Sequence, residues 1–293
     1  MREVTHFYLA VIGFIILIAS SVSSIFFHNP QFYVFFCLSS VLVLDYLDFR
    51  IRKKSLISFF MKKTHHSAVM FFIIASIVFA VVVDLLYGVV LFKIWSWPSY
   101  TTINWVILYT LINFFFIILV YETYMITQHF LSKNFIQKHY RKISISKNNH
   151  FKATIVSLSL IFLFLPLAYF FLFGEKLGGF VMILPFIGLW LICDSILYLH
   201  GQTPIVQKIM TGDGRTIAGI LITTTFLVLT HEFVNSFSSE WVYLNIPFMN
   251  LQIGSVPVMV IVGWIPLVLF CISFLDLTKI LEKEVFDKKR IKE

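Results

Sequence analysis

THEFVNSFSSEWVYLNIPFMNLQIGSVPVMVIVGW, residues 230–264, is a stretch in which a long apolar segment ends in a group of polar side chains. His231, Glu232 and Asn235 occupy positions i, i+1 and i+4, which fall on one broad face of a helix. A loop without Lys or Arg follows, and a second apolar segment begins near Pro257. An ionisable side chain in a membrane helix costs about 2.5–3.5 kcal/mol to bury and is a functional-site hypothesis by default. Glu232 is therefore the first candidate residue.

The composition of the chain is typical of an integral membrane protein. Hydrophobic residues make up 59% of the 293 residues and charged residues only 13%, about half the charge of a soluble domain. Cys37, Cys193 and Cys271 stand singly in apolar segments, so they predict neither a disulfide framework nor a metal site. No small-residue cleavage site follows the first apolar run, so we expect it to be retained as a helix.

Eight apolar runs are long enough to cross a hydrocarbon layer about 30 Å thick. The chain is thus predicted to be an all-α polytopic transmembrane helix bundle of about eight spans. The runs cover residues 7–27, 31–47, 67–92, 105–127, 153–173, 177–199, 216–236 and 253–276.

The basic residues alternate between the connections of these spans. Of the 23 Lys and Arg residues, all but Lys93 and Lys176 fall at the termini or after an even-numbered span. The positive-inside rule then predicts that both termini are cytoplasmic, in a plasma or inner membrane. The net charge of +8 follows from this topology, so the expected partner is the lipid bilayer and no nucleic acid is expected. Oligomeric state does not follow from the sequence.

Polar and aromatic positions recur and predict an internal tandem repeat. Asp84 and Glu232 are 148 residues apart, and Trp95-Ser96-Trp97 and Trp241-Val242-Tyr243 are 146 apart. Each half would cross the membrane an even number of times, so the halves would be parallel and related by an axis along the membrane normal. Asp84 and Glu232 would then face each other across one cavity. The predicted halves are residues 1–150 and residues 151–293, the second with a basic cytoplasmic tail.

The same residues resemble a family of carotenoid enzymes. His231-Glu232, the motif Trp241-Val242-Tyr243 nine residues after the Glu, and Val256-Pro257 have the spacing of the lycopene cyclase domain, a tandem-repeat module. Asp84 with Trp95-Ser96-Trp97 is similar to that feature in the first half. The segment Gly254 to Trp264 resembles the V-P-x₆-W segment of membrane-bound carotenoid hydratases.

One departure bears on the chemistry that this resemblance implies. Cyclase domains carry a pair of Glu just after the Pro, where this chain has Val258, Met259 and Val260. If those Glu are the acids of cyclisation, a hydratase-like or other isoprenoid role fits this chain better than ring closure.

The expected chemistry is acid-initiated protonation of a C=C bond in a lipid-soluble isoprenoid, without a cofactor or a metal. Glu232 would be the proton donor, an ionised Asp84 would stabilise the carbocation, and His231 or Asn235 would hold a water. Aromatic faces stabilise such cations, although Trp and Tyr also form the interfacial belt of any membrane protein. The candidate substrate-binding residues are Trp95, Trp97, Trp241, Tyr243 and Trp264.

The main alternative is a transporter in which Asp84 and Glu232 bind a cation or a proton. Transporters usually break helices at corresponding positions of both halves. Here the intramembrane prolines all lie in the second half, which argues against transport. They are Pro166, Pro185, Pro257 and Pro266.

Two further alternatives are a membrane prenyltransferase-like enzyme and a non-catalytic membrane scaffold. Asp45-Tyr46-Leu47-Asp48 resembles the first Asp-rich motif of membrane prenyltransferases, whose carboxylates hold Mg²⁺, but Leu44 and Arg52 depart from that pattern. Acids at the predicted cytoplasmic helix ends are interpreted as structural groups that pair with nearby Lys and Arg. They are Asp45, Asp48, Glu122, Asp194 and Asp276.

Overall fold

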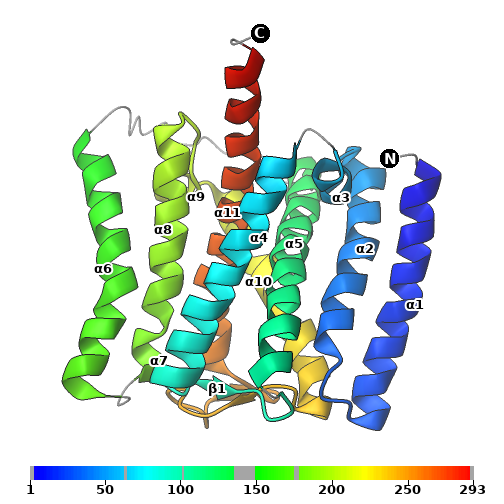
Figure 1. Ribbon diagram of the computed structural model, residues 1–293, viewed down its shortest axis with the longest axis vertical. Coiled ribbons are helices and arrows are strands. Elements are labelled where there is room, and N and C mark those ends of the chain that lie inside the picture. The colour runs from blue at the N-terminus through cyan, green and yellow to red at the C-terminus, as the bar shows by residue number, and fades with distance from the viewer. Residues whose placement is uncertain (1–2, 63–64, 101, 135–148, 175–177, 291–293) are drawn as a thin grey trace.

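The computed structural model of the chain is an all-α bundle whose helices stand side by side (Figure 1). It describes residues 3–62, 65–100, 102–134, 149–174 and 178–290. Within these residues, seven helices are long and apolar enough to cross a membrane, so the chain is a multi-pass membrane protein. The helices are α1 (Glu3–Phe27), α2 (Tyr33–Arg52), α3 (Leu56–Phe60), α4 (His66–Phe79), the π-helix η2 (Ala80–Leu91), α5 (Thr102–Asn134), α6 (Asn149–Phe173), α7 (Gly178–Val181), α8 (Ile183–Leu199), α9 (Ile205–Met210), α10 (Gly214–Ser238) and α11 (Val258–Arg290).

The eighth expected span, residues 31–47, is helix α2, which is not among these seven. Its last eight residues include Asp45, Asp48, Arg50 and Arg52, which lower its apolarity. Its 20 residues reach about 30 Å at 1.5 Å per residue. It lies between α1 and α5 and extends along the bundle as they do (Figure 1).

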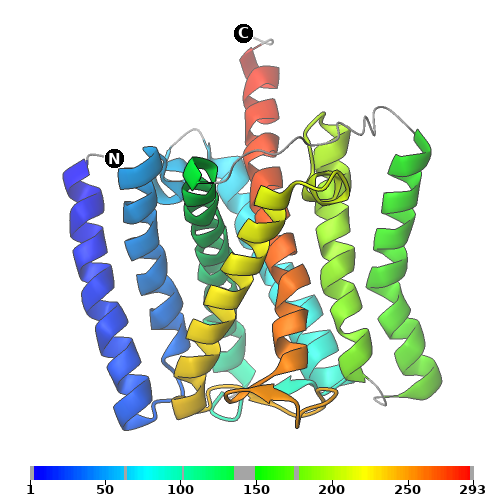
Figure 2. The same cartoon turned by 180° about the vertical axis from the view of Figure 1, so that it is seen from behind.

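The middle of the bundle is formed by α4 with η2, α5, α10 and α11, and two helix pairs flank it (Figures 1 and 2). The pair α1 and α2 packs on one side through α5, and the pair α6 and α8 packs on the other side through α11. The apolar windows of α5 and α11 are 67% and 61% buried, whereas those of α1 and α6 are each 17% buried. The core therefore lies between the central helices, and α1 and α6 present their apolar surface to lipid.

The two ends of the bundle differ in structure. Strands β1 (Trp95–Ser96) and β2 (Val242–Tyr243) pair antiparallel at one end and form what we call the ribbon, and β3 (Gln252–Ile253) pairs with β4 (Val256–Pro257) beside it. We call this the ribbon end. Helix α1 begins and α11 ends at the opposite end, which also carries the connections from α2 to α4 and from α8 to α10 (Figure 1). Because most Lys and Arg residues belong to that end, we call it the basic end.

Two contacts agree with a tandem repeat, which stays a prediction. The Asp45 carboxylate accepts the backbone N–H of Ile57, twelve residues later, at the start of the short helix α3. The Asp194 carboxylate accepts the N–H of Val206, also twelve residues later, at the start of the short helix α9. The ribbon register places Ser96 opposite Val242. These two residues are 146 positions apart in sequence, which is the spacing of the predicted repeat. A two-fold axis through that pair would exchange β1 and β2.

The third span changes its helical type half-way. Helix α4 ends at Phe79 and continues without a break as η2, whose turns are wider because each N–H bonds five residues back. Asp84 and Gly88 lie on the buried side of η2. Since π-helical turns are rare and occur frequently at functional sites, this segment marks the part of the helix around Asp84.

Candidate functional site

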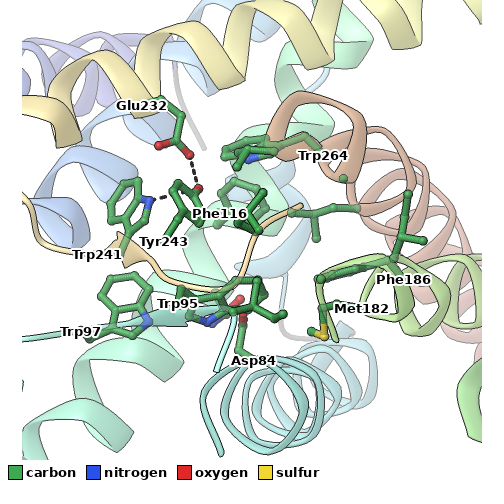
Figure 3. A pocket seen from close by; sticks show the side chains of 18 of the residues that line it. Asp84, Trp95, Trp97, Phe116, Met182, Phe186, Glu232, Trp241, Tyr243 and Trp264 are labelled. Carbon is green, nitrogen blue, oxygen red and sulfur yellow. Dashed lines mark hydrogen bonds between the residues drawn. The ribbon is translucent and has the colours of Figure 1, made fainter. Parts of the chain in front are cut away.

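A cavity with a volume of about 160 Å³ lies at the ribbon end, between the central helices (Figure 3). An engineered apolar cavity of about 150 Å³ holds benzene, so this space fits a group of similar size. Its lining is apolar and aromatic apart from a few polar groups, and no Lys, Arg or His is among the described residues that form it. The polar lining residues are Tyr33, Asp84, Tyr109, Asn113, Glu232 and Tyr243, with the indoles of Trp95, Trp97, Trp241 and Trp264.

Glu232 reaches the cavity from the last two turns of α10 and is 5% exposed. The chain turns sharply after α10 at Ser239, which has a left-handed backbone conformation, and returns as β2 beneath the same helix. This return places the Tyr243 hydroxyl 2.5 Å from Glu232 Oε1, to which it donates a hydrogen bond (Figure 3). The Trp241 indole N–H in turn donates to the Tyr243 hydroxyl at 3.2 Å. One carboxyl oxygen of Glu232 is therefore fixed.

Burial keeps Tyr243 in its protonated, hydrogen-donating form. Tyr243 lies in the loop segment outside the membrane helices, and burial, followed by the nearby Glu232 carboxyl, raises its pKa well above 10. A phenol in this state donates its hydrogen to the carboxyl over the whole physiological pH range. Tyr243, expected as an aromatic substrate contact, thus also positions the acid.

Asp84 lines the same cavity from η2, on the side away from Glu232 (Figure 3). It is 8% exposed, and its hydrogen-bonding partners are Tyr109 and Asn113 on α5. These partners stand four residues apart and so share a helix face. The cavity thus holds two carboxyl groups, each hydrogen-bonded to neutral partners.

All five aromatic candidates line the cavity: Trp95, Trp97, Trp241, Tyr243 and Trp264. Trp97 directly follows β1 and Trp241 directly precedes β2, and their ring centroids are 5.5 Å apart. The indole N–H groups of Trp95 and Trp97 are buried and have no hydrogen-bond partner among the described residues. A buried donor of this kind normally finds an acceptor, so these two groups are suited to bind a ligand oxygen or a water.

His231 and Asn235 are not among the residues that line the cavity, and their expected role in holding a water stays a prediction. The Tyr33 hydroxyl lies 2.5 Å from His231 Nδ1, and the imidazole is packed between α2 and the central helices. Asn235 bonds both backbone groups of Trp241, donating to its carbonyl at 2.9 Å and accepting from its N–H at 3.2 Å. Both side chains therefore hold elements together.

Several residues of the site were not singled out from the sequence. Tyr109 and Asn113 carry a usable signal, because a Tyr and an Asn on one face of an apolar span need a buried partner. Tyr33 and Met182 come from helices distant in sequence, and their place in the lining follows only from the packing. Glu240 was also missed, because an acid in a loop is normally solvated. It is 0% exposed here and accepts from the Tyr100 hydroxyl and the Tyr33 N–H.

The acids at the basic end are bound by the protein itself, which weighs against a Mg²⁺-diphosphate site. Arg52 pairs with Asp48 through two N–H groups. The carboxylate of Asp45 accepts from Ser55 at 2.8 Å and contacts His6 at 3.2 Å, so at Asp45, unlike Asp48, hydroxyl, imidazole and N–H partners take the place of the expected Lys or Arg. Within the described part of the chain, no cluster of three or more His, Cys, Asp or Glu could hold a metal.

Comparison of the chain with protein-family models, with curated proteins and with solved structures finds no match. Any function for this chain must therefore be inferred from the geometry of its cavity.

Proposed function

We propose that the protein is an integral membrane enzyme that protonates a C=C bond of a lipid-soluble isoprenoid, with Glu232 as the acid. The observation that carries this proposal is a pair of buried carboxyl groups, Glu232 and Asp84, in an aromatic cavity lined, among the residues that the structure describes, by no Lys, Arg or His. Ionisable residues inside membrane spans are rare and mark substrate pathways and proton relays. Two carboxyl groups that share a cavity without a basic partner among the described lining residues are therefore explained by a role in proton transfer.

The first step of the proposed reaction is proton transfer from Glu232 to one alkene carbon. The acid must be neutral before it acts, and a low-dielectric, water-poor site favours the neutral form of a carboxyl group. Tyr243 holds Oε1 at 2.5 Å, which leaves the other oxygen free to carry the transferred proton. Such general acid catalysis contributes about 10²–10⁴-fold in rate.

The second step is capture of the carbocation that forms at the neighbouring carbon. The faces of Trp241 and Trp264 line the cavity, and aromatic faces attract cations most strongly when desolvated. The indole N–H groups of Trp95 and Trp97 are free to hold a water oxygen. Addition of that water to the cation releases one proton, which Asp84 accepts. The product is the alcohol, formed from the alkene and one water. Glu232 then regains a proton from solvent and Asp84 releases the one it accepted, so both carboxyl groups return to their starting states.

The resemblance to carotenoid hydratases and to the lycopene cyclase domain points to the same substrate class. Hydration is favoured over cyclisation because Val258, Met259 and Val260 replace the Glu pair of cyclase domains. Of these three, Met259 and Val260 line the cavity and supply only apolar surface. We place the protein in a plasma or inner membrane with both termini cytoplasmic, so that the cavity lies in the outer leaflet.

A transporter that binds a cation or proton between Asp84 and Glu232 is the second candidate. The acid pair itself and the wide turns of η2 beside Asp84 favour it. Against it, the four indoles and the apolar lining offer a small hydrophilic ion few oxygen ligands, which cations such as Na⁺ require.

The test is lipid extraction from cells that express the wild-type chain, Glu232→Gln or no chain, compared by mass spectrometry. Gln keeps the shape of Glu and can still accept from Tyr243 but has no transferable proton. We expect the lipid converted by the wild type to accumulate in the Glu232→Gln cells. The matched control is Glu3→Gln, the same substitution at a carboxylate that is 55% exposed and pairs with Arg50 outside the cavity.

An unchanged lipid profile in Glu232→Gln membranes that contain normal amounts of protein would refute the enzymatic proposal. An ion current present in the wild type and lost in Glu232→Gln would instead assign the acid pair to transport.

A further inference from the structure

We propose that the cavity opens sideways to the lipid, where α7 and α8 face α11, and that Gly263 sets the width of the group that enters. The ligand is then the end group of a long apolar lipid whose remaining chain stays in the bilayer. The chemical identity of that lipid rests on the proposed function, whereas the route and the width limit rest on geometry alone.

The ribbon closes the cavity toward the water at its end of the bundle. Two hydrogen bonds tie the chain after β2 to the segment between η2 and β1: Leu244 N–H donates to the Ile94 carbonyl at 2.8 Å, and the Asn245 amide donates to the Phe92 carbonyl at 3.2 Å. Glu240, in the turn between α10 and β2, is fully buried and bonds the N–H of Tyr33 at 2.8 Å. Asn235 on α10 also donates to the carbonyl of Trp241, just before β2, at 2.9 Å. A ligand therefore has no direct path from this side.

The flank formed by α1 and α2 is closed as well. The Ser24 hydroxyl donates to the Val234 carbonyl at 2.9 Å, and the His28 imidazole bonds the Phe237 carbonyl at 2.7 Å, so α1 is fixed to α10. Tyr33 then fills the space behind Trp241, with ring centroids 4.7 Å apart. Access between α10 and α2 is blocked.

The inner end of the cavity, toward the middle of the membrane, is filled by aromatic rings. Phe116 is 4% exposed and its ring packs edge-on against Trp264. The ring of Phe79 stacks on that of Phe270, with centroids 4.8 Å apart, and its centroid lies 6.1 Å from that of Phe186. This layer separates the cavity from the basic end.

The wall between α7–α8 and α11 carries half-buried lining residues and one position without a side chain. Met259, Gly263 and Leu267 recur every four residues on one face of α11, and all three line the cavity while remaining half-buried rather than buried. Ile183 on the facing helix is also half-buried. A methyl group built at Gly263 would meet no atom within 4 Å. The lack of a side chain at this position therefore leaves real space.

The edge of this opening at the ribbon end is defined by a second glycine. A methyl group at Gly179 would come within 2.3 Å of the Asn245 carbonyl oxygen, so α7 packs tightly against the loop there. Next to this contact, Phe180 and Phe248 are 43% and 60% exposed, and their rings meet edge to face at 5.7 Å. Exposed aromatic rings at the end of a membrane span lie in the interface with lipid, so the opening lies just inside the bilayer.

The inference can be tested by fluorescence, because four of the six Trp residues line the cavity: Trp95, Trp97, Trp241 and Trp264. The probe is a hexadecyl chain that ends in a bromophenyl ring, added to the full chain in bilayer nanodiscs. Bromine quenches an indole on contact. We expect saturable quenching of the wild type and a half-saturating concentration about tenfold higher or more for Gly263→Phe, because a filled cavity disfavours the ligand. Iodide in the water should quench little.

The matched control is Val262→Phe, which adds an aromatic ring at the neighbouring position, 38% exposed on α11 and outside the lining. It should bind the probe as the wild type does. If Gly263→Phe does not fold, the series Gly263→Ala, Gly263→Val and Gly263→Leu must weaken binding stepwise with side-chain volume. Wild-type probe binding in the largest variant that folds would overturn the inference, and so would strong quenching by iodide. Neither result depends on the lipid profile of Glu232→Gln, so the two proposals fail separately.

Discussion

Glu240, in the loop between α10 and β2, is a buried acid whose titration is shifted toward neutral pH. Burial raises its pKa from its ordinary value near 4.5 to about 7, although hydrogen bonds from Tyr100 and from the Tyr33 N–H act in the opposite direction. The folded protein therefore keeps this proton up to a higher pH than the unfolded chain does. Between these two values the folded state binds more protons, so raising the pH lowers the free energy of unfolding.

The corresponding prediction is a difference between wild type and Glu240→Gln. From about pH 4.5 to about pH 7, Glu240 should remove up to about 1.4 kcal/mol of stability per pH unit, and the Gln variant should lack this component. The variant should also be less stable at every pH, because Gln offers one acceptor oxygen to two donors. The informative quantity is therefore the slope of the free energy of unfolding against pH. Unfolding temperatures of purified protein across this range measure it. Parallel curves for the two proteins would show that Glu240 does not titrate in this window.

At the level of single residues, the sequence identified the acids and aromatic groups but not the partners of the polar groups. Glu232 was visible because a charge inside an apolar run is costly wherever the helix packs. His231 and Asn235 share its helix, yet a helix pattern gives only the direction of a side chain. Their use is decided by Tyr33, 198 residues from His231 in sequence, and by the backbone of Trp241, and neither contact follows from local spacing.

At the level of elements, the attachment of the ribbon to α10 depends on Asn235. Replacing Asn235 with Ala removes both hydrogen bonds to Trp241 and leaves its buried N–H and C=O unpaired, at about 1–3 kcal/mol each. We expect Asn235→Ala to lower the free energy of unfolding by several times RT and to loosen the ribbon. Asn235→Asp, which keeps the acceptor for the N–H and loses the donor, should retain part of that stability.

Denaturation of both variants, followed by tryptophan fluorescence, measures this effect. Amide hydrogen exchange at Trp241 and Tyr243 reports whether the ribbon opens first. Wild-type stability and wild-type exchange in Asn235→Ala would contradict the structural role of this amide and return it to the candidates for binding a water.

The helices were predictable from apolar runs because lipid requires long segments whose backbone groups bond internally. The expected bounds differ from most observed helices by a few residues, mostly at the ends that carry charge, as in α2. Helices α5 and α11 extend further beyond the apolar runs, to Asn134 and Arg290. The π-helix η2 could not be foreseen, since a shift of hydrogen bonds from four to five residues leaves the apolar pattern unchanged. The same holds for the two-residue strands β1 and β2, which form only because two distant loops meet.

At the level of the whole molecule, the positions of Asp45 and Asp194 bear on the predicted tandem repeat. Each caps a short helix twelve residues further along the chain, and the ribbon pairs the two halves about Ser96 and Val242. The lining of the cavity is not symmetric, however. Helices α7 and α8 with Met182 between them contribute four residues to it, whereas the corresponding first-half helix α2 contributes only Tyr33. In this arrangement one half closes its flank and the other leaves its flank open to lipid.

The orientation of the bundle determines which leaflet supplies the ligand. Lys and Arg concentrate at the basic end, and Lys93 is the sole basic residue that the described ribbon-end connections carry, so the basic end should be cytoplasmic. A reporter enzyme that is active only on the extracytoplasmic side of the membrane should be active when inserted at Asn245. It should be inactive when inserted at Gly212, between α9 and α10. Insertion at Lys54, between α2 and α3, is the matched control and should also be inactive, because that connection lies at the basic end. The reverse pattern would place the cavity in the cytoplasmic leaflet, and the lipid that enters past Gly263 would then have to be drawn from the inner monolayer.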